Sequence, residues 1–544
     1  MSSTTARVRA AYERMHTAPH SNVWIDLRPQ SSVEAEARHV DAKVAQGHPL
    51  PLAGTLLAVK GNIDVAGLPT TAGCPPYAYE PAADAPAVAA LRAAGAIVVG
   101  TTNMDQFATG LVGTRSPYGP VSSALAGDRV SGGSSAGSAV AVALGFVDLA
   151  LGTDTAGSGR VPAAFNGIVG IKPTRGLIPT AGVVPACASL DCVTVFARTL
   201  AEARGAMALL ASPAPPPRRP GPWRVAVAAA DRLGELDAGW AEAYERAARA
   251  LAGAGVELRT LDLTPFTETA TLLYEGAFVA ERYTAVGRFI DKHPNSPDLD
   301  PTVAGIITAA RDLPAHRLFA DRERLAVLRA AATAELGDCD ALLLPTAPGH
   351  PTLAEVAADP VGANTRLGRF TNSANLLDLC AVAVPGGEVR GLPFGVMLLG
   401  PAQTDDRIAE IAALLAPPLR IAVVGAHLTG QPLNHQLLAL GARLAATTTT
   451  AATYRLYALD TVPPKPGLVR ATGGAAIEAE VWELPAAALG TFAAALPRPM
   501  TLGSVELADG TSSPGFLCEP QALEGARDIT EFGSWRAYLR HTQQ

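Results

Sequence analysis

The sequence lacks the cysteine pattern of a disulfide-stapled or zinc-binding protein. It has six cysteines among 544 residues, and no two of them form a CxxC pair. Scattered single cysteines in a long chain are typical of reduced thiols in the cytoplasm. They are Cys74, Cys187, Cys192, Cys339, Cys380 and Cys518. The sequence therefore predicts a cytoplasmic protein with no disulfide framework and no metal site.

Long hydrophobic runs are also missing. The N-terminal segment has no apolar core of the kind that signal peptides carry. The apolar run at 139–152, AVAVALGFVDLALG, is too short to cross a bilayer and contains Asp148. We therefore expect neither secretion nor a membrane partner.

Positive charge is in short supply. Lysine and arginine number 43 against 50 aspartate and glutamate residues, which gives a net charge of −7. An acidic chain does not favour a nucleic-acid surface. Hydrophobic residues make up 48% and charged residues 17%, so a sizeable core is expected. The length suggests two to four domains.

Residues 50–200 show the alternation of an α/β fold. The segment 85–104 indicates a helix, a glycine stop and a buried strand, and 134–154 indicates a helix followed by a strand. A proline-rich surface loop is expected at 213–222, and helices dominate 270–335.

The pattern changes beyond about residue 420. Short apolar segments that favour strands follow one another, such as TYRLYAL at 453–459 and IEAEVWELP at 477–485. We therefore expect a first domain over 1–416, ending before Pro417-Pro418, and a smaller β-rich α+β domain over 420–544.

Two clusters of small hydroxyl residues, GGSSAGS at 132–138 and GSG at 157–159, lie close together, and the apolar run between them contains no histidine. The first cluster by itself is compatible with an anion-binding turn at a helix N-terminus, although it lacks the P-loop spacing. The second by itself is compatible with a structural turn. Taken separately, neither cluster distinguishes a functional role from a structural one.

Together with AVKGNIDVAGLPTTAG at 58–73, the two clusters resemble the amidase signature family, in which a Lys–Ser–Ser triad replaces Ser-His-Asp. GIVGIKPTRGLIPTAGVVP at 167–185 extends the resemblance, which covers roughly residues 20–415. It implies an α/β fold of the amidase signature type, a mixed β-sheet covered by helices. Ala136 and Ala156 stand where the family commonly has glycine.

The resemblance assigns the triad to Lys60, Ser134 and Ser158. Ser158 is the expected nucleophile, because an amide carbon is a poor electrophile and requires an activated attacker. With no histidine nearby, neutral Lys60 is the expected base, since burial lowers the pKa of a lysine. Ser134, which the family holds on a cis peptide bond, relays the proton. The alternative for Lys60 is a solvated or salt-bridged surface lysine.

The turn that precedes Ser158 is expected to form the oxyanion hole. The backbone amides of Thr155, Ala156 and Gly157, together with that of Ser158, can point several N–H groups at one oxygen. A tetrahedral intermediate needs such donors where its negative charge develops.

Tyr274 and Arg282 lie eight residues apart in LLYEGAFVAERYTAVGRF. On a continuous helix this spacing places both near one face. The pattern alone favours a solvent-facing Arg282 paired with Glu275 or Glu281. An arginine that faces the active site instead suits a small carboxylate, which it holds bidentately.

The Tyr-x7-Arg spacing and three further segments together resemble the allophanate hydrolases, and this resemblance favours the second interpretation. The segments are GTDTAGSGRVPA at 152–163, ACASLDCVTVFART at 186–199 and VGAHLTGQPLNHQLLALGARL at 424–444. It implies that Tyr274 and Arg282 bind the substrate allophanate and that Gly110 lines the pocket. It further implies an enzyme without cofactors that acts in urea degradation, with functional coupling to a urea carboxylase. We also expect a homodimer.

The C-terminal segment resembles the second domain of that family, whose fold is similar to gamma-glutamyl cyclotransferases. The family assigns this domain a part in decarboxylating the first product, N-carboxycarbamate. HLTGQPLNHQL at 427–437 supplies polar groups, of which His435 is the first choice as proton donor. For any one of these residues taken alone, ordinary surface polarity is the favoured explanation.

Three other functions remain open at this point. A broad-specificity amidase and the catalytic subunit of a tRNA-dependent amidotransferase share the triad, although the acidic chain and the unrelated C-terminal segment disfavour the second. A catalytically inactive fold that binds a small ligand is the third, and the intact triad disfavours it.

Overall fold

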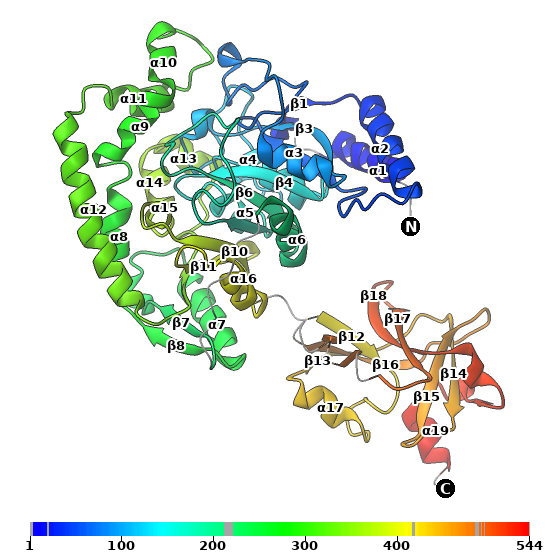
Figure 1. Cartoon of the computed structure of the whole chain (residues 1–544). Coiled ribbons are helices and arrows are strands. Elements are labelled where there is room, and N and C mark those ends of the chain that lie inside the picture. The colour runs from blue at the N-terminus through cyan, green and yellow to red at the C-terminus, as the bar shows by residue number, and fades with distance from the viewer. Residues whose placement is uncertain are drawn as a thin grey trace. The chain divides into compact units, whose positions relative to one another are not determined.

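The chain folds into two compact units, Met1–Leu415 and Ala416–Gln544, each with its own hydrophobic core (Figure 1). The structure is a computed structural model. The residues that it describes are 4–18, 21–211, 221–415, 419–484, 489–490, 492–493 and 496–542. Almost all of the predicted loop at 213–222, and Pro417-Pro418, lie outside the described residues.

One mixed sheet of 11 strands runs through the first unit in the order β1-β3-β2-β4-β6-β5-β10-β11-β9-β7-β8. β2 pairs in parallel with β3 and β4, and β7 pairs in parallel with β8 and β9, whereas the other pairs are antiparallel. The strands are β1 (Trp24–Leu27), β2 (Leu56–Lys60), β3 (Ile97–Thr102), β4 (Leu149–Asp154), β5 (Val169–Lys172), β6 (Cys192–Ala197), β7 (Arg224–Val227), β8 (Glu257–Thr260), β9 (Ala341–Pro345), β10 (Cys380–Val389) and β11 (Leu392–Gly400).

The central strands are buried along their whole length because helices cover the sheet. Every residue of β2, β3, β4 and β6 is buried, and their sequences are accordingly continuous apolar runs. α4 packs on β2 and β4, α6 on β5 and β6, and α7 and α16 on β10 and β11. On α7, Ala243, Tyr244, Ala247 and Leu251 are buried at the three- and four-residue spacing of an amphipathic helix.

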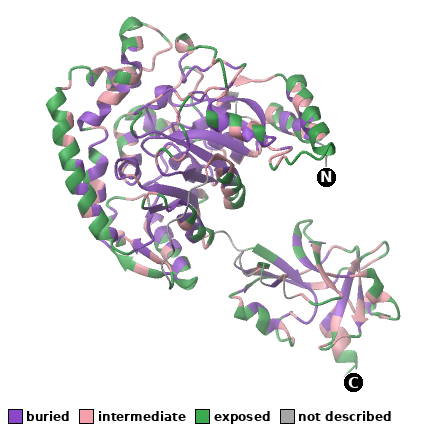
Figure 2. Cartoon of the chain, viewed as in Figure 1, coloured by how far each residue is buried: buried purple, intermediate pink, exposed green. Residues whose placement is uncertain are grey.

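The helices of the first unit are mostly short, and α12 is an exception at 22 residues. Figure 2 shows α12 largely exposed on its outer face, whereas the sheet is buried. The helices are α1 (Thr4–Thr17), α2 (Gln30–Ala45), α3 (Pro86–Ala93), α4 (Ala136–Ala143), α5 (Val161–Phe165), α6 (Leu200–Leu210), α7 (Trp240–Gly253), α8 (Thr264–Thr271), α9 (Ala280–Arg282), α10 (Arg288–Lys292), α11 (Pro301–Ala309), α12 (Ala315–Leu336), α13 (Leu353–Ala358), α14 (Gly362–Leu367), α15 (Asn372–Leu376) and α16 (Asp405–Ala413).

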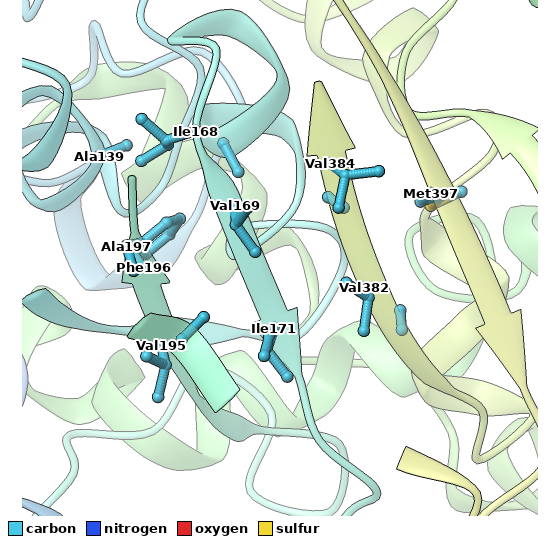
Figure 3. Packing of buried hydrophobic residues seen from close by; sticks show 14 of the residues in the cluster. Ala139, Ile168, Val169, Ile171, Val195, Phe196, Ala197, Val382, Val384 and Met397 are labelled. Atoms are coloured by element: carbon cyan, nitrogen blue, oxygen red, sulfur yellow. The ribbon is translucent and has the colours of Figure 1, made fainter. Parts of the chain in front are cut away.

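Branched aliphatic side chains fill the core where β5, β6 and β10 meet (Figure 3). Val169, Ile171, Val195, Val382 and Val384 are all at least 95% buried there. Burying one such side chain contributes about 1.5–3 kcal/mol. β6 also pairs with β4, so this core adjoins the strand that Ser158 follows.

The second unit is rich in strands, as the sequence predicts. A five-stranded sheet has the order β13-β16-β12-β18-β17, and a three-stranded sheet has the order β15-β14-β19. The elements are β12 (Leu419–Val423), α17 (Asn434–Ala439), β13 (Arg443–Thr449), β14 (Tyr454–Leu459), β15 (Lys465–Arg470), β16 (Glu478–Leu484), β17 (Met500–Glu506), β18 (Ser512–Cys518), β19 (Arg527–Asp528) and α19 (Trp535–Thr542).

All six cysteines are buried and free in this structure. Within the described ranges, no helix is both long enough and apolar enough to cross a bilayer. The predicted fold class, a mixed sheet covered by helices plus a β-rich second unit, is confirmed.

Candidate active site

Lys60, Ser134 and Ser158 form a connected chain of polar atoms inside the first unit. Lys60 Nζ lies 2.7 Å from Ser134 Oγ, and Ser134 Oγ lies 3.0 Å from Ser158 Oγ. Lys60 and Ser134 are fully buried, and Ser158 is 2% exposed. The Gly133–Ser134 peptide bond is cis, as the resemblance implies. A proton can therefore pass from Ser158 through Ser134 to Lys60 without leaving hydrogen-bond distance.

The sheet brings these three residues together from distant parts of the sequence. Lys60 is the last residue of β2, and Ser158 follows the C-terminal end of the neighbouring parallel strand β4. Ser134 lies just before α4, which packs on both strands. The ends of adjacent parallel strands meet at one edge of the sheet, so side chains that project from them converge there.

Burial lowers the pKa of Lys60 to about 7, against the opposing effect of the carboxylates of Asp105, Asp191 and Asp154. The interpretation of Lys60 as a surface lysine is thus wrong. Its Nζ has a second hydrogen-bond partner, Thr153 Oγ1, at 2.6 Å. A neutral amine held between two hydroxyl groups is able to act as a base near neutral pH.

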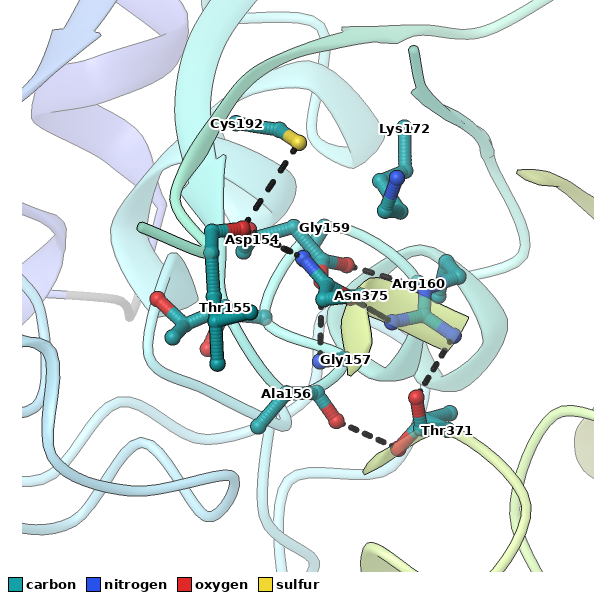
Figure 4. A network of polar contacts seen from close by, with 12 residues as sticks. Asp154, Thr155, Ala156, Gly157, Gly159, Arg160, Lys172, Cys192, Thr371 and Asn375 are labelled. Atoms are coloured by element: carbon teal, nitrogen blue, oxygen red, sulfur yellow. Dashed lines mark hydrogen bonds and ion pairs between the residues drawn. The ribbon is translucent and has the colours of Figure 1, made fainter. Parts of the chain in front are cut away.

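A buried ion pair fixes the loop that carries Ser158 (Figure 4). Both Asp154 and Arg160 are 0% exposed, and Asp154 accepts two hydrogen bonds of 2.9 Å from the Arg160 guanidinium. Burial alone would raise the pKa of Asp154, but Arg160 lowers it below its usual value. Asp154 also accepts the backbone N–H groups of Gly157 and Gly159 at 3.0 and 2.9 Å.

The loop before Ser158 carries the three backbone amides that are expected in the oxyanion hole, those of Thr155, Ala156 and Gly157. The Gly157 amide donates to Asp154 Oδ1 in this structure. The other two are those of Thr155 and Ala156, and the Thr155 side chain is anchored by its hydroxyl, which donates to the buried carboxylate of Asp191. Asp191 in turn accepts the backbone N–H groups of Ala186 and Cys187. The turn is thus held from outside the triad.

Residues at 371–375, far downstream, complete this network. Thr371 Oγ1 donates to the Ala156 carbonyl at 2.6 Å, and Arg160 Nη1 donates to the Thr371 carbonyl at 3.1 Å. Asn375 Nδ2 donates to the Asp154 carbonyl (Figure 4). It also donates to the Leu190 carbonyl. Asp154 and Arg160 belong to the motif around Ser158 and are recognisable from it, but no pattern in the sequence marks Thr371 or Asn375.

Tyr274 and Arg282 are in contact, although not on a continuous helix. Arg282 Nη2 donates to Tyr274 OH at 3.0 Å, and the guanidinium lies 5.1 Å from the centre of the tyrosine ring. The predicted helix is wrong here, because α8 ends at Thr271 and α9 begins at Ala280. Gly276 adopts an extended conformation between them and packs against Leu272. A turn, rather than two helical turns, brings the side chains together.

The solvent-facing position that the pattern alone favoured for Arg282 is also wrong, since Arg282 is 1% exposed. Its Nη1 donates to Thr109 Oγ1 at 2.8 Å and to the Ala108 carbonyl at 3.3 Å. Gly110 follows Thr109 directly and is buried. Neither predicted partner pairs with Arg282, and Glu281 instead accepts hydrogen bonds from Ser189.

No carboxylate forms an ion pair with Arg282 in the part of the chain that the structure describes. Its Nε is buried and without a hydrogen-bond partner there. Arg282 lies close enough to Lys60 and Asp191 to affect the pKa of both side chains. A buried guanidinium without a counter-ion is costly, so this arrangement favours an anionic ligand beside the triad.

The second unit contains a cavity of about 450 Å³ with a mostly apolar wall. His427, Gln436 and Lys465 contribute its polar groups, and His427 Nε2 lies 3.0 Å from Gln436 Oε1. Burial lowers the pKa of His427, whose ring stacks on Phe516. His435, the first choice from the sequence, is exposed and does not line this cavity. Its Nδ1 contacts the carbonyl of Pro432 instead.

Among the described residues, no group of three or more histidine, cysteine, aspartate or glutamate side chains is arranged to hold a metal ion. The site consists of hydroxyl groups, one amine, one guanidinium and backbone amides. This set of groups is suited to acyl transfer at an amide carbonyl next to a negatively charged group.

Comparison with known proteins gives consistent matches. Residues 6–409 match the model of the amidase family, and residues 419–540 match that of the allophanate hydrolase C-terminal domain. Urea amidolyase of Saccharomyces cerevisiae is 41% identical over 97% of this chain. The chain spans only 32% of the length of that relative.

A solved structure of similar extent is the selenomethionine-substituted allophanate hydrolase of Kluyveromyces lactis. It is 38% identical, with a TM-score of 0.71 over 99% of this chain and 97% of that one. The urea amidolyase of the same organism matches all of this chain over 36% of its own length. The chain belongs to the amidase family, and it carries the allophanate hydrolase C-terminal domain after the amidase unit.

Proposed function

We propose that this protein is an allophanate hydrolase that cleaves the terminal amide of allophanate through an acyl-enzyme on Ser158. The observation that carries the proposal is Arg282, a buried guanidinium without a carboxylate partner among the described residues, next to the triad. Allophanate is a urea that bears one carboxylate. Arg282 would hold the carboxylate, with Tyr274 hydrogen-bonded beside it, and the terminal carbonyl would face Ser158.

The first half of the reaction forms the acyl-enzyme. Neutral Lys60 accepts a proton from Ser134 as Ser134 takes the proton of Ser158, along contacts of 2.7 and 3.0 Å. Ser158 Oγ then attacks the terminal amide carbon, and the developing oxyanion accepts hydrogen bonds from the turn at Thr155 and Ala156. The proton returns through Ser134 to the amide nitrogen, and ammonia leaves.

The second half regenerates the enzyme. Water attacks the acyl-enzyme, with Lys60 and Ser134 again taking up its proton. The C–O bond to Ser158 breaks and N-carboxycarbamate is released. This product is a dicarboxylate that loses carbon dioxide when its nitrogen is protonated, which leaves carbamate and then ammonia and carbon dioxide.

We place the decarboxylation in the cavity of the second unit. His427 is suited to supply the proton and Lys465 to bind a carboxylate, because both line the cavity. His435 lies outside it and serves as a matched control on the same segment. His427→Ala should delay carbon dioxide release behind the first ammonia, whereas His435→Ala should not. The reverse result would return the role to His435.

Some relatives of the amidase unit are named for a different substrate. A glutamyl-tRNA(Gln) amidotransferase chain of Halobacterium salinarum is 36% identical, but the match covers 67% of this chain. The allophanate hydrolase C-terminal domain at 419–540 therefore favours allophanate over a tRNA-bound substrate. We further propose that the protein is a cytoplasmic homodimer and that a urea carboxylase supplies its allophanate. The resemblance to urea amidolyases supports this coupling.

The experiment is to measure ammonia and carbon dioxide release from allophanate, malonamate and simple aliphatic amides. The proposal expects allophanate to be turned over with the highest kcat/KM, and Ser158→Ala to abolish release from every amide. Equal kcat/KM for all three would indicate a broad-specificity amidase. Activity that survives in Ser158→Ala would exclude the proposed nucleophile.

A further inference from the structure

Thr371 contacts the oxyanion turn from a distant part of the chain. It precedes α15 and is fully buried. Its hydroxyl donates to the carbonyl of Ala156 at 2.6 Å, across 215 positions of sequence (Figure 4). Ala156 lies two residues before the candidate nucleophile, so this bond acts directly on the turn that is expected to form the oxyanion hole.

The bond to Ala156 is one of two that hold the same peptide group. The Ala156 carbonyl and the Gly157 N–H belong to one planar unit. Thr371 holds the oxygen of this unit, and Asp154 Oδ1 holds its N–H at 3.0 Å. With both edges held, rotation of this plane is restrained, and this limits the orientations open to the adjoining Ala156 amide. The peptide that carries the Thr155 N–H is held separately, because Asn375 Nδ2 donates to its carbonyl, that of Asp154.

Thr371 is itself held in place. Arg160 Nη1 donates to its carbonyl at 3.1 Å, and the same guanidinium is bonded to Asp154. Its side chain occupies the space that a Cβ at residue 157 would need. Gly157 has φ +130°, a conformation that also favours glycine. Close approach of the threonine and the lack of a side chain at 157 therefore belong together.

We propose that Thr371 is a positioning residue of the oxyanion hole, which restrains the Ala156–Gly157 peptide so that the neighbouring Ala156 amide meets the developing oxyanion. The inference deepens the proposed amidase function and rests on it. Thr371 forms no bond to the triad, and its hydroxyl does not titrate in the working range. It should therefore affect stabilisation of the oxyanion without affecting the base Lys60.

The test compares Thr371→Ser with Thr371→Ala, which differ only by the hydroxyl group. Thr371→Ala should lower kcat for ammonia release about 10-fold or more, because the loss of one oxyanion donor costs about 100- to 1000-fold and Thr371 acts at one remove. Thr371→Ser should restore most of the activity. Thr269→Val is the control, since Thr269 is also buried and its hydroxyl donates to a carbonyl, that of Pro265.

Three further measurements separate positioning from a general structural role. The inactivation rate by a fluorophosphonate, whose phosphoryl oxygen occupies the oxyanion position, should fall in Thr371→Ala in parallel with kcat. The affinity for malonate, which engages Arg282 and forms no tetrahedral adduct, should be unchanged. The pH at which kcat/KM falls should be unchanged as well. Fluorophosphonate labelling does not depend on allophanate, so it tests Thr371 even if the proposed substrate is wrong.

Two outcomes would overturn the proposal. In the first, the fluorophosphonate inactivates Thr371→Ala at the wild-type rate, and the variant releases ammonia with the wild-type kcat. In the second, it loses malonate binding to the same extent as activity, which would indicate a general loss of structure. If Thr371→Ala does not fold, Thr371→Val keeps the side-chain volume and takes its place, with the same outcomes decisive.

Discussion

The protonation of Lys60 decides whether the triad is active. Because burial lowers its pKa to about 7, a large fraction is neutral and basic at physiological pH. Below the pKa the amine is already protonated and cannot take the proton of Ser134. The kcat/KM for ammonia release should therefore fall about tenfold per pH unit below pH 7 and level off above it.

The pH profile of kcat/KM measures this directly. Lys60→Arg is the control, since its guanidinium stays charged and should give no activity at any pH. A profile that rises only near pH 10.4, the usual pKa of lysine, would contradict a desolvated base.

Arg282 should determine the preference for a carboxylate. A lysine at this position supplies a charge but not the planar fork that binds a carboxylate through two parallel bonds. Arg282→Lys should raise KM for allophanate about 10- to 100-fold, since a hydrogen bond to a charged group contributes about 1.5–3 kcal/mol. Turnover of neutral amides should change little, and steady-state kinetics on both substrates checks the difference.

The matched control is Arg311→Lys, because Arg311 is partly exposed and pairs with Asp291. This substitution should change the steady-state kinetics of neither substrate. If Arg282→Lys slows neutral amides and allophanate equally, Arg282 supports the site but does not select the substrate.

The loop between β4 and α5 depends on the Asp154–Arg160 pair. Removing one partner of a fully buried pair leaves the other charge without compensation. Asp154→Asn should therefore lower the free energy of unfolding by about 3–5 kcal/mol. Urea unfolding of the isolated variant measures this change.

An exposed pair provides the comparison for this element. The side chains of Asp231 and Arg232 lie 3.9 Å apart and are 79% and 78% exposed. Asp231→Asn should therefore leave the free energy of unfolding almost unchanged. If Asp154→Asn lowers the free energy of unfolding as little as Asp231→Asn does, the loop keeps its conformation without the pair.

The division of the whole molecule into two units makes the two proposed stages of the reaction separable. The triad, Tyr274 and Arg282 all lie within Met1–Leu415, which has its own core. A chain of residues 1–415 should therefore fold and release the first ammonia from allophanate at the full rate. Carbon dioxide and the second ammonia should lag, because N-carboxycarbamate then decays without assistance.

A time course of both gases for the full and the shortened chain checks this prediction. Addition of the separate second unit should remove the lag if that unit acts on the free product. Identical time courses for both chains would assign the second unit a structural role.

Local motifs were sufficient to predict the triad. Lys60, Ser134 and Ser158 each sit in a short run of small residues whose order and spacing resemble one family. The α/β pattern of residues 50–200 and the β-rich C-terminal segment were also evident, because strand and helix periodicities are local. What a local pattern could not give was the route of the chain at 272–280, where a turn replaces the expected helix.

The sequence by itself thus determined which residues can carry the proposed chemistry, since the candidate nucleophile, relay and base lie in motifs of a few residues. Only the tertiary structure decided how that chemistry is set up. The pKa of Lys60 depends on burial beneath α4 and the sheet, the burial of Arg282 depends on the loop at Thr109, and the oxyanion turn is fixed by Thr371. Burial and contacts between segments more than 100 residues apart exist only once the chain is folded, so no local pattern carries them.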